Sequence, residues 1–465
     1  MEALMYFVRA TYPFFLVYTL VYLLQWVIGT FVSLRRLSRF PENQQAIPRF
    51  FTDELASQYP VSVIVPAYNE QSCICDTIDS LLKEDYPGLE IIVVDDGSAD
   101  STASRVVRQY RLKKTDCDPS RPLETQPVLS CYSRALQGKN LTLICKKNGG
   151  KSDALNCGLN YCPTPYCVIV DADTQVRTGA LRIMAAHFFM DKRTIVCAGA
   201  VGTLLHTNDL HKTLPFYRRL LVKFQHIEYY RTFYMQRLLF DHVNANVIVS
   251  GAFAMFDRDL VLHAGGYRTN TIGEDMELTM RLHAYCLSQN RPYRIIYAPE
   301  ARCDTQVPFR YHDYFRQRRR WHIGMIQSLK HHLYMIGSHY YGWVGVLSVL
   351  FTMVYELLSP FVELFGLVIL ILSAWLGMLN PGFACGLMLL YVALSLLTQS
   401  ILLSTLRTYQ VEPMRNRRHF QLILTAASEC ILFHPINIVI KLVTFLTYRQ
   451  HKSTWTHILR VRENS

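Results

Sequence analysis

The chain has 465 residues, of which 50% are hydrophobic, and its formal net charge is +12 at pH 7. This length accommodates a large catalytic domain and several membrane spans, and the basic residues cluster beside apolar segments, which is typical of a membrane protein rather than of a nucleic-acid-binding protein. The 13 cysteines lack the spacing of a metal site or a disulfide framework, so we expect reduced, mostly buried thiols in a cytosolic domain.

The N-terminal segment predicts a membrane helix. Residues 14–32 are apolar and long enough to span a bilayer, and Arg35, Arg36 and Arg39 follow them. Because basic residues mark the cytosolic side of a span, we expect the N-terminus outside and the basic flank inside. Residues 1–40 therefore form the first predicted unit, a transmembrane helix rather than a cleaved signal sequence.

Residues 41–310 predict an α/β domain. Short apolar runs alternate with helix-length segments, and the runs cover residues 61–65, 91–94, 141–145 and 167–170. Fully apolar strands separated by helices are typical of a sheet covered on both faces, so we expect a mostly parallel sheet. The polar stretch at residues 112–138 is expected to be a surface insertion.

Polar side chains follow three of these strands at the point where each strand ends. They are Tyr68 and Glu70, Asp95 and Asp96, and Asp171 and Asp173. Open α/β sheets bind ligands beyond the carboxyl ends of their strands. We therefore expect these side chains to line one crevice.

Asp171 and Asp173 are candidates for metal binding. They are separated by one residue at a strand end, so both side chains are expected on the same side. Two carboxylates suit a hard divalent cation, Mg²⁺ or Mn²⁺, whose other ligands come from a diphosphate. A turn or a helix cap is the alternative explanation for an isolated Asp-x-Asp.

Two further candidates have equally plain structural alternatives. Asp95 and Asp96 either form a turn after a strand or accept hydrogen bonds from a base or ribose. Lys151 follows two glycines at an expected helix start, where it either faces a phosphate or is solvated.

Gly273, Glu274 and Asp275 precede a helical pattern over residues 276–285. An acid at a helix start is ordinarily a cap that interacts favourably with the helix dipole. It can also be a general base if it is held within reach of the hydroxyl that it deprotonates. Either Glu274 or Asp275 fits that second role.

Two amphipathic helices are expected beside the membrane. Residues 213–241 are too charged to span, and either lie on the membrane surface or pack against the sheet. Residues 311–341 contain the second helix, with Gln317, Arg320 and Trp321. Arginine matches phosphate oxygens and tryptophan offers a stacking face, whereas attraction to anionic lipid is the simpler explanation.

Residues 342–448 predict the C-terminal membrane region. The segment 342–372 is long and contains Pro360, which predicts a kink, and 381–406 is a second, uncharged span. The segment 420–448 either crosses the membrane or turns back at Pro435, and the two alternatives place the tail at 449–465 on opposite sides. Because this tail is basic, we expect it in the cytosol. Two acids lie in the first of these spans, and they either pair with the basic interfacial helix or line a polar path. They are Glu356 and Glu363.

Five motifs in this order resemble one known family. They lie at residues 66–70, 95–97, 171–173, 273–275 and 317–321. Together they are similar to the membrane-embedded, processive group of family 2 inverting glycosyltransferases, which includes cellulose, chitin, hyaluronan and poly-N-acetylglucosamine synthases. The resemblance covers residues 61–330 and implies a GT-A-like cytosolic domain. The absence of a cyclic-dinucleotide-binding domain after the spans makes a regulated bacterial cellulose synthase a poorer match than poly-N-acetylglucosamine and chitin-oligosaccharide synthases.

The resemblance also implies roles for individual residues. The expected donor-nucleotide site comprises Tyr68, Glu70, Asp95, Asp96, Lys151 and Asp171. Asp173 with Asp171 is expected to bind the metal, and Asp275, with Glu274 beside it, is expected to be the base. The expected acceptor and diphosphate site comprises Gln317, Arg320, Trp321, Ser250 and Gly251.

The implied function is a multi-pass enzyme of the cell membrane with a cytosolic catalytic domain. It is expected to transfer sugar from UDP-GlcNAc or UDP-Glc to a growing β-linked polysaccharide and to couple this to export, with any accessory export subunit left open. One alternative is a non-processive transferase that adds a single sugar to a lipid-linked or glycan acceptor. A transporter or scaffold without catalysis is disfavoured because every expected acid is present.

Overall fold

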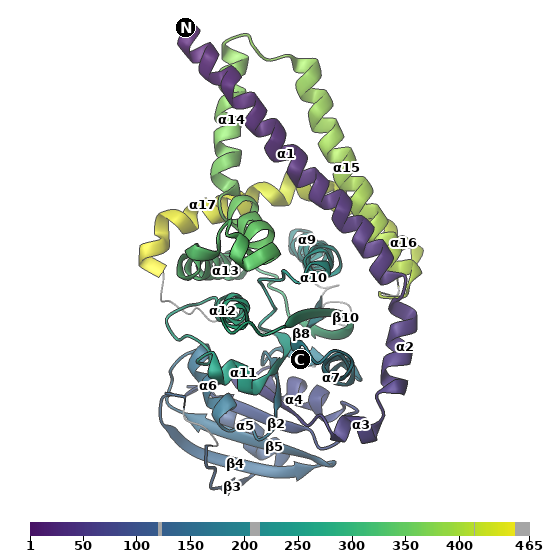
Figure 1. Cartoon of the computed structure of the whole chain (residues 1–465), viewed down its shortest axis with the longest axis vertical. Coiled ribbons are helices and arrows are strands. Elements are labelled where there is room, and N and C mark those ends of the chain that lie inside the picture. Colours follow the sequence, from purple (N-terminus) through teal and green to yellow (C-terminus); the bar gives the residue numbers. More distant parts are fainter. Residues whose placement is uncertain (120–122, 205–213, 413, 452–465) are drawn as a thin grey trace.

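The computed structural model describes residues 1–119, 123–204, 214–412 and 414–451. An α/β domain forms the lower part of the molecule, and long helices rise from it (Figure 1). Within the described residues the domain contains one ten-stranded sheet, ordered β3-β4-β5-β2-β1-β6-β9-β8-β10-β7. The first long helix is α1 (Glu2–Leu37), and two short helices, α2 (Phe40–Phe50) and α3 (Asp53–Ser57), connect it to the first strand of the sheet.

The centre of the sheet is the parallel part that the apolar runs predict. Its strands are β1 (Val61–Ala67), β2 (Glu90–Asp95), β5 (Lys139–Lys146) and β6 (Tyr166–Val170). Their Val and Ile side chains are almost all buried, because helices cover both faces. The covering helices include α4 (Ile74–Leu82), α5 (Thr102–Tyr110), α6 (Lys151–Asn160) and α7 (Ala180–Met190).

The sheet as a whole is mixed, so the prediction of a mostly parallel sheet is wrong. Among the described residues, four strand pairings are parallel and five are antiparallel. The remaining strands are β3 (Lys113–Thr115), β4 (Val128–Leu136), β7 (Thr174–Val176), β8 (Thr194–Thr203), β9 (Phe253–Asp257) and β10 (Arg294–Thr305). The start of β9 pairs with the end of β6, Phe253 opposite Val170, so the chain enters β9 at the carboxyl edge and must run backwards.

The stretch at 112–138 is also more ordered than a surface insertion. It contributes β3 and β4, which extend the sheet antiparallel to β5. Only Cys131 of β4 is fully buried, and polar residues such as Ser130 and Arg134 interrupt the strand, so a search for apolar runs does not find it.

The charged helical segment near 213–241 packs inside the molecule. It forms α9 (Phe216–Arg231), a π-helical turn η2 (Thr232–Gln236) and α10 (Arg237–His242). His226 Nδ1 lies 2.7 Å from Thr203 Oγ1 of β8, and the Gln225 amide donates to the Pro308 carbonyl at 2.8 Å. Of the two expected placements, packing against the sheet is therefore the one observed.

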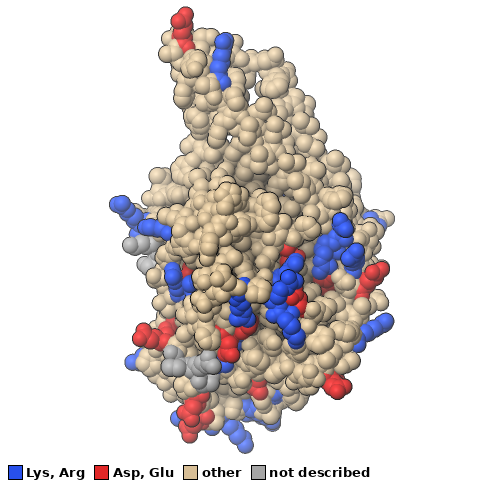
Figure 2. Space-filling view, in the orientation of Figure 1, with Lys and Arg blue, Asp and Glu red and all other residues tan. Residues whose placement is uncertain are grey.

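Two described helices are long and apolar enough to cross a membrane, α1 and α15 (Pro381–Thr408). A third crossing is possible if the segment Val344–Leu357 and α14 (Ser359–Trp375) act as one span, because these two helices are bent by 52°. Pro360 lies at this bend, as predicted. Figure 2 shows these helices as an almost uncharged upper part of the molecule, above a region rich in Lys and Arg.

The expected span at 420–448 is divided. It forms α16 (Asn416–Ser428), a π-helical turn η7 (Glu429–Phe433) and α17 (His434–His451), and α17 runs across the base of the long helices (Figure 1). Residues 452–465 of the basic tail lie outside the described residues.

The two acids of the bent pair both have polar partners, and the partner of Glu356 comes from the charged segment at 213–241. Glu356 accepts a hydrogen bond from Gln236 at 2.7 Å, and Glu363 lies 2.9 Å from His434. Lys441 of α17 donates to the backbone carbonyl of Glu356 at 2.8 Å.

Candidate active site

The loops after β1 and β2 are tied together at the carboxyl edge of the sheet. Asn69 has a positive φ of 56°, and its side chain accepts from the Ala99 amide at 2.8 Å. The backbone amide of Asn69 donates to Ser98 Oγ at 2.9 Å, and the backbone amide of Glu70 donates to Thr102 Oγ1 at 2.9 Å. The side chain of Tyr68 remains 36% exposed beside these loops.

Asp95 and Asp96 differ sharply in their surroundings. Asp95 Oδ1 is buried and has no hydrogen-bond partner among the described residues, and burial raises the pKa of this carboxyl group. The carboxylate of Asp96 instead accepts from Lys146 Nζ at 2.6 Å and from the amides of Gly149 and Gly150 at 3.0 and 2.7 Å. Asp95 thus retains the capacity to accept from a ligand, whereas Asp96 fixes the glycine turn that precedes α6.

Lys151 is the first residue of α6 and bridges two of the predicted acids. Its Nζ lies 2.7 Å from Asp171 Oδ1 and 3.0 Å from Glu274 Oε1. Burial alone would lower the pKa of Lys151, but these two carboxylates outweigh burial and raise it. With its side chain only 15% exposed, Lys151 is not the solvated residue that one alternative expected.

Asp171 and Asp173 lie on either side of the turn that follows β6. Asp171 is partly exposed and paired with Lys151, while Asp173 is buried and accepts from the Thr305 and Thr174 hydroxyls at 3.3 and 3.4 Å. Within the described residues no three His, Cys, Asp or Glu side chains are grouped as a metal site would need. A Mg²⁺ or Mn²⁺ ion that is also held by a diphosphate needs only one or two carboxylates, so the donor set fits that open kind of site.

Asp275 lies in the first turn of α12 (Glu274–Ser288) and is held by backbone amides. Its Oδ1 accepts from Met276 at 2.7 Å and its Oδ2 accepts from Gly251 at 3.1 Å. Burial raises the pKa of Asp275 to about 6, with a further rise from Glu274, while Lys151 opposes the rise. A fixed carboxylate with a pKa near neutrality is suited to general-base catalysis.

The loop with Ser250 and Gly251 is packed directly against Asp275. A Cβ atom on Gly251 would lie 3.3 Å from both Cβ and Oδ2 of Asp275, so this position has room for glycine but little more. Ser250 lines a pocket next to this loop.

The helix α13 (Tyr311–His331) holds the start of α12 in place. Gln327 accepts from the Ile272 amide at 2.8 Å, and Ser328 donates to the Gly273 carbonyl at 3.1 Å. A Cβ atom on Gly273 would lie only 2.8 Å from backbone atoms of Gly324, and the reverse is also true. The two backbones are therefore in direct contact.

The predicted residues Gln317, Arg320 and Trp321 occupy the same helix. Gln317 is buried, and Trp321 is 41% exposed. The sequence-based prediction missed the three residues of α13 that touch the start of α12, Gly324, Gln327 and Ser328. Helical spacing could have found them, because positions 317, 321, 324 and 328 follow one another at intervals of four, three and four residues, and 327 lies three residues after 324.

Arg318 is not a membrane-surface charge. Its guanidinium group lies 4.8 Å from the centre of the Tyr314 ring and 4.3 Å from the centre of the Trp321 ring, and it forms a 2.5 Å ion pair with Glu228. Cation–π contacts of this kind favour one orientation of an aromatic ring, so Arg318 supports Trp321 from inside the fold.

Comparison with known proteins identifies the family of the chain. The model of the family described as "Glycosyltransferase like family 2" matches residues 58–324. The chain is 26% identical over 314 residues to the poly-β-1,6-N-acetyl-D-glucosamine synthase of Staphylococcus aureus, and 26% identical over 313 residues to that of Staphylococcus epidermidis. These matches cover 67% of this chain and 65% of each relative, so the chain spans about two thirds of their length.

Among solved structures, the fold is similar to that of a mannosyltransferase from Pyrobaculum calidifontis. The TM-score is 0.51 at 20% sequence identity, and the match covers 87% of this chain and 99% of the other. That protein was solved in complex with GDP-Man and Mn²⁺.

The fold and the carboxyl-edge site define a GT-A-like glycosyltransferase. The chain belongs to glycosyltransferase family 2.

Proposed function

We propose that this protein is a membrane-integrated, inverting glycosyltransferase that extends a β-linked polysaccharide from a UDP-sugar, with UDP-GlcNAc or UDP-Glc as donor. One observation carries the proposal: Asp275, held by the Gly251 amide, lies beside a Glu274–Lys151–Asp171 ion bridge at the carboxyl edge of the sheet. This arrangement would place a base beside the groups that receive a diphosphate. The names of the staphylococcal relatives support a polysaccharide product.

In the proposed site, the nucleotide lies at the loops after β1 and β2. Tyr68 offers an exposed ring, and Glu70 and Asp95 offer carboxylates to the base or ribose. Asp96 would act indirectly. Its carboxylate holds the glycine turn that precedes Lys151 and so positions that residue. Lys151 and Asp171 then border the diphosphate.

A Mg²⁺ or Mn²⁺ ion would be held by Asp171 and Asp173. When bound, such an ion would offset the negative charge that develops on the departing diphosphate. Arg320 of α13 is proposed to contribute positive charge to the same group, and a guanidinium group matches phosphate oxygens in shape.

Asp275 is proposed to take the proton from the acceptor hydroxyl. The acceptor oxygen forms a bond to the anomeric carbon of the donor as the bond from that carbon to the diphosphate oxygen breaks. UDP leaves with the bonding electron pair, and an α-linked donor gives a β-linked product. Trp321, supported by Arg318, would stack on the terminal sugar, and Gln317 with the loop at Ser250 and Gly251 would orient it.

The proposed arrangement in the cell places residues 41–310 in the cytosol, with α1, the bent pair and α15 in the membrane. Residues 311–341 would form the interface between the two parts, and residues 342–448 the C-terminal membrane region. Export would follow from transfer next to these helices. The second candidate, a single addition to a lipid-linked or glycan acceptor, uses the same catalytic groups and differs in the length of its product.

The test is transfer by the purified protein in detergent. The protein is incubated with UDP-GlcNAc, UDP-Glc and GDP-mannose, each with Mg²⁺ or Mn²⁺, and nucleotide release and product length are measured. We expect UDP release and a polymer that linkage-specific hydrolases degrade. Products that carry one added sugar would favour the second candidate, and no nucleotide release from any donor would exclude both.

Asp275→Asn tests the assigned base. The amide keeps the shape but cannot take a proton at neutral pH, so we expect kcat to fall about 100-fold to 10,000-fold. Undiminished UDP release in this variant would contradict the assignment.

A further inference from the structure

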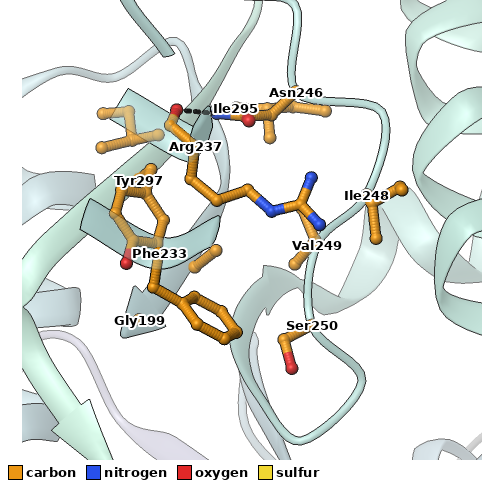
Figure 3. A pocket seen from close by; sticks show the side chains of 11 residues that line it. Gly199, Phe233, Arg237, Asn246, Ile248, Val249, Ser250, Ile295 and Tyr297 are labelled. Carbon is orange, nitrogen blue, oxygen red and sulfur yellow. Dashed lines mark hydrogen bonds between the residues drawn. The ribbon is translucent and has the colours of Figure 1, made fainter. Parts of the chain in front are cut away.

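Strand β10 carries polar groups near both of its ends. Near its start, Ile295 and Tyr297 line a small pocket, and Figure 3 shows Arg237 and Ser250 beside it. This pocket has room for about one water molecule, so it suits a water rather than a larger ligand. At the other end of β10, Arg302 belongs to a cluster of ion pairs that has no part in the proposed mechanism.

This cluster contains two arginines and two acids. Arg177, the residue after β7, donates to both carboxylate oxygens of Asp304 in β10, from Nε at 2.6 Å and from Nη2 at 3.0 Å. Arg302 donates to Glu412 Oε1 at 2.5 Å, and Arg177 lies 3.3 Å from the same oxygen. The four charges balance, and the side chains of Arg302 and Glu412 are only 7% and 9% exposed.

Glu412 comes from outside the α/β domain. It lies in the turn between the apolar helix α15 and helix α16, and the carbonyl of the preceding residue, Val411, also accepts from Arg302. The end of α15 is therefore attached to the end of β10 through a side chain and through the backbone. A buried ion pair of this kind holds its members in place, because the loss of one member leaves the other charge without compensation.

The cluster adjoins the turn that is proposed to bind the metal ion. Strand β7 has only three residues, begins directly after Asp173 and lies at the edge of the sheet, where β10 is its neighbour. In this pairing Thr174 lies opposite Thr305, and the Thr305 hydroxyl donates to Asp173 at 3.3 Å. Since so short an edge strand forms few ladder hydrogen bonds, the contact of Arg177 with Asp304 adds much to its attachment.

We propose that Glu412 is a positioning residue for the metal site: through Arg177 and Arg302 it fixes β7 against β10 and so sets the position of Asp173. The proposal rests on the proposed function, in which Asp173 is a metal ligand. It deepens that function by making the metal site depend on the end of α15. Glu412 itself touches neither the metal nor the substrates.

The metal-binding turn has a second support, which limits the expected effect. Thr77 of α4 donates to the carbonyl of Ala172, between the two acids of the turn, at 2.7 Å. Residues that orient a metal ligand from behind typically change metal affinity about 10-fold to 100-fold when they are lost. Because Thr77 remains in place, we expect the lower end of this range for the loss of Glu412.

Binding of Mn²⁺ without a sugar donor tests the proposal. The full-length protein in detergent is titrated with MnCl₂ in the presence of UDP, and free Mn²⁺ is measured by its electron paramagnetic resonance signal. Glu412→Gln keeps the shape of the side chain and removes its charge, so Mn²⁺ should bind about tenfold more weakly. Arg177→Lys alters a side chain that is 40% exposed and cannot form both bonds to Asp304, so it should also weaken binding.

Arg36→Met is the matched control. It removes another ion pair between β10 and a long helix, the 2.9 Å pair with Glu300, which involves neither β7 nor the metal-binding turn. We expect a lower melting temperature in both Arg36→Met and Glu412→Gln, but weaker Mn²⁺ binding only in Glu412→Gln. In assays of UDP release, Glu412→Gln should need more Mn²⁺ for half of its maximal rate, and saturating Mn²⁺ should largely restore that rate. A general loss of structure would instead lower the rate at every Mn²⁺ concentration.

The outcomes separate this proposal from the proposed function. Wild-type Mn²⁺ affinity in Arg177→Lys or in folded Glu412→Gln overturns the role of Glu412, and so does equal weakening in Arg36→Met. A wild-type protein that binds no Mn²⁺ with UDP also overturns it, whereas UDP release by that protein would retain the transferase proposal. Mn²⁺ binding that depends on Glu412, in a protein that releases UDP from no donor, supports the role of Glu412 and removes the transferase proposal.

Discussion

The environment of Asp275 predicts a specific pH dependence. The carboxyl group must be deprotonated to accept a proton, and burial raises its pKa to about 6. kcat/KM for UDP release should therefore fall about tenfold per pH unit below pH 6 and reach a plateau above it. The profile is measured from pH 4.5 to 8 at constant ionic strength.

The variant Glu274→Gln separates the two causes of the raised Asp275 pKa, burial and the charge of Glu274. Glu274 adds to the rise in the Asp275 pKa, so removing its charge should move the acidic limb to lower pH. An acidic limb that stays in place in this variant would mean that another group limits the rate.

Lys151 gives a second prediction at the scale of the residue. Lys151→Met removes the ammonium group between Asp171 and Glu274. It leaves the buried Glu274 carboxylate without its cation, and the loss of one partner of a buried pair costs about 3 kcal/mol. We expect a lower melting temperature and a larger rise of that temperature on addition of Mn²⁺ than in the wild type. Equal Mn²⁺ shifts in the two proteins would argue against Asp171 as a metal ligand.

At the scale of the element, the contact between α12 and α13 should be intolerant of a single methyl group. Alanine at Gly273 or at Gly324 would place Cβ 2.8 Å from backbone that cannot yield, and overpacking of this kind costs about 1–3 kcal/mol. The added methyl group would push the start of α12, and Asp275 with it, out of position. We therefore expect a large loss in the rate of UDP release even where the variant protein still folds. Gly386→Ala is the matched control, since its Cβ would meet nothing within 4 Å; equal activity in all three variants would refute the argument.

The elements show what the sequence can and cannot predict. Apolar runs identify β1, β2, β5 and β6 because both faces of these strands are buried. The same criterion misses β4, where only Cys131 is fully buried. It also gives no direction for β9, because that direction depends on where the preceding loop enters the sheet. Direction and edge position are tertiary properties that hydropathy does not encode.

The candidate site also has features that the sequence predicts and features that it does not. Acids at strand ends are predictable, because topology brings those ends together. The different environments of Asp95 and Asp96 are not, since they depend on Lys146 at the end of β5 and on the glycine turn after it. The contact of Gly324 with Gly273 likewise joins segments that are distant in the chain.

At the scale of the whole molecule, ion pairs join the α/β domain to the helical part of the chain. Arg36 at the end of α1 pairs with Glu300 of β10 at 2.9 Å, and Arg231 of α9 pairs with Glu429 of η7 at 2.8 Å. Asn43 of α2 also donates to Glu300, at 2.8 Å. These contacts fix the catalytic domain relative to the helices at several points.

The proposed membrane orientation predicts which ends of α15 are accessible. Asn380 precedes this helix and Arg415 follows it, and both are exposed. In a Cys385→Ser background, an impermeant maleimide applied to intact cells should label Asn380→Cys, whereas Arg415→Cys should react only after permeabilisation. The reverse pattern would place the catalytic domain outside.

The bridge formed by Lys151 has a consequence for timing. Its ammonium group lies between Asp171 and Glu274, and there it lowers the pKa of Asp275. A diphosphate that attracts Lys151 would withdraw this positive charge from Asp275, the proposed base. The pKa of Asp275 would then rise, and Asp275 would become a stronger proton acceptor when a leaving group is present. Binding of the donor would itself activate the proposed base.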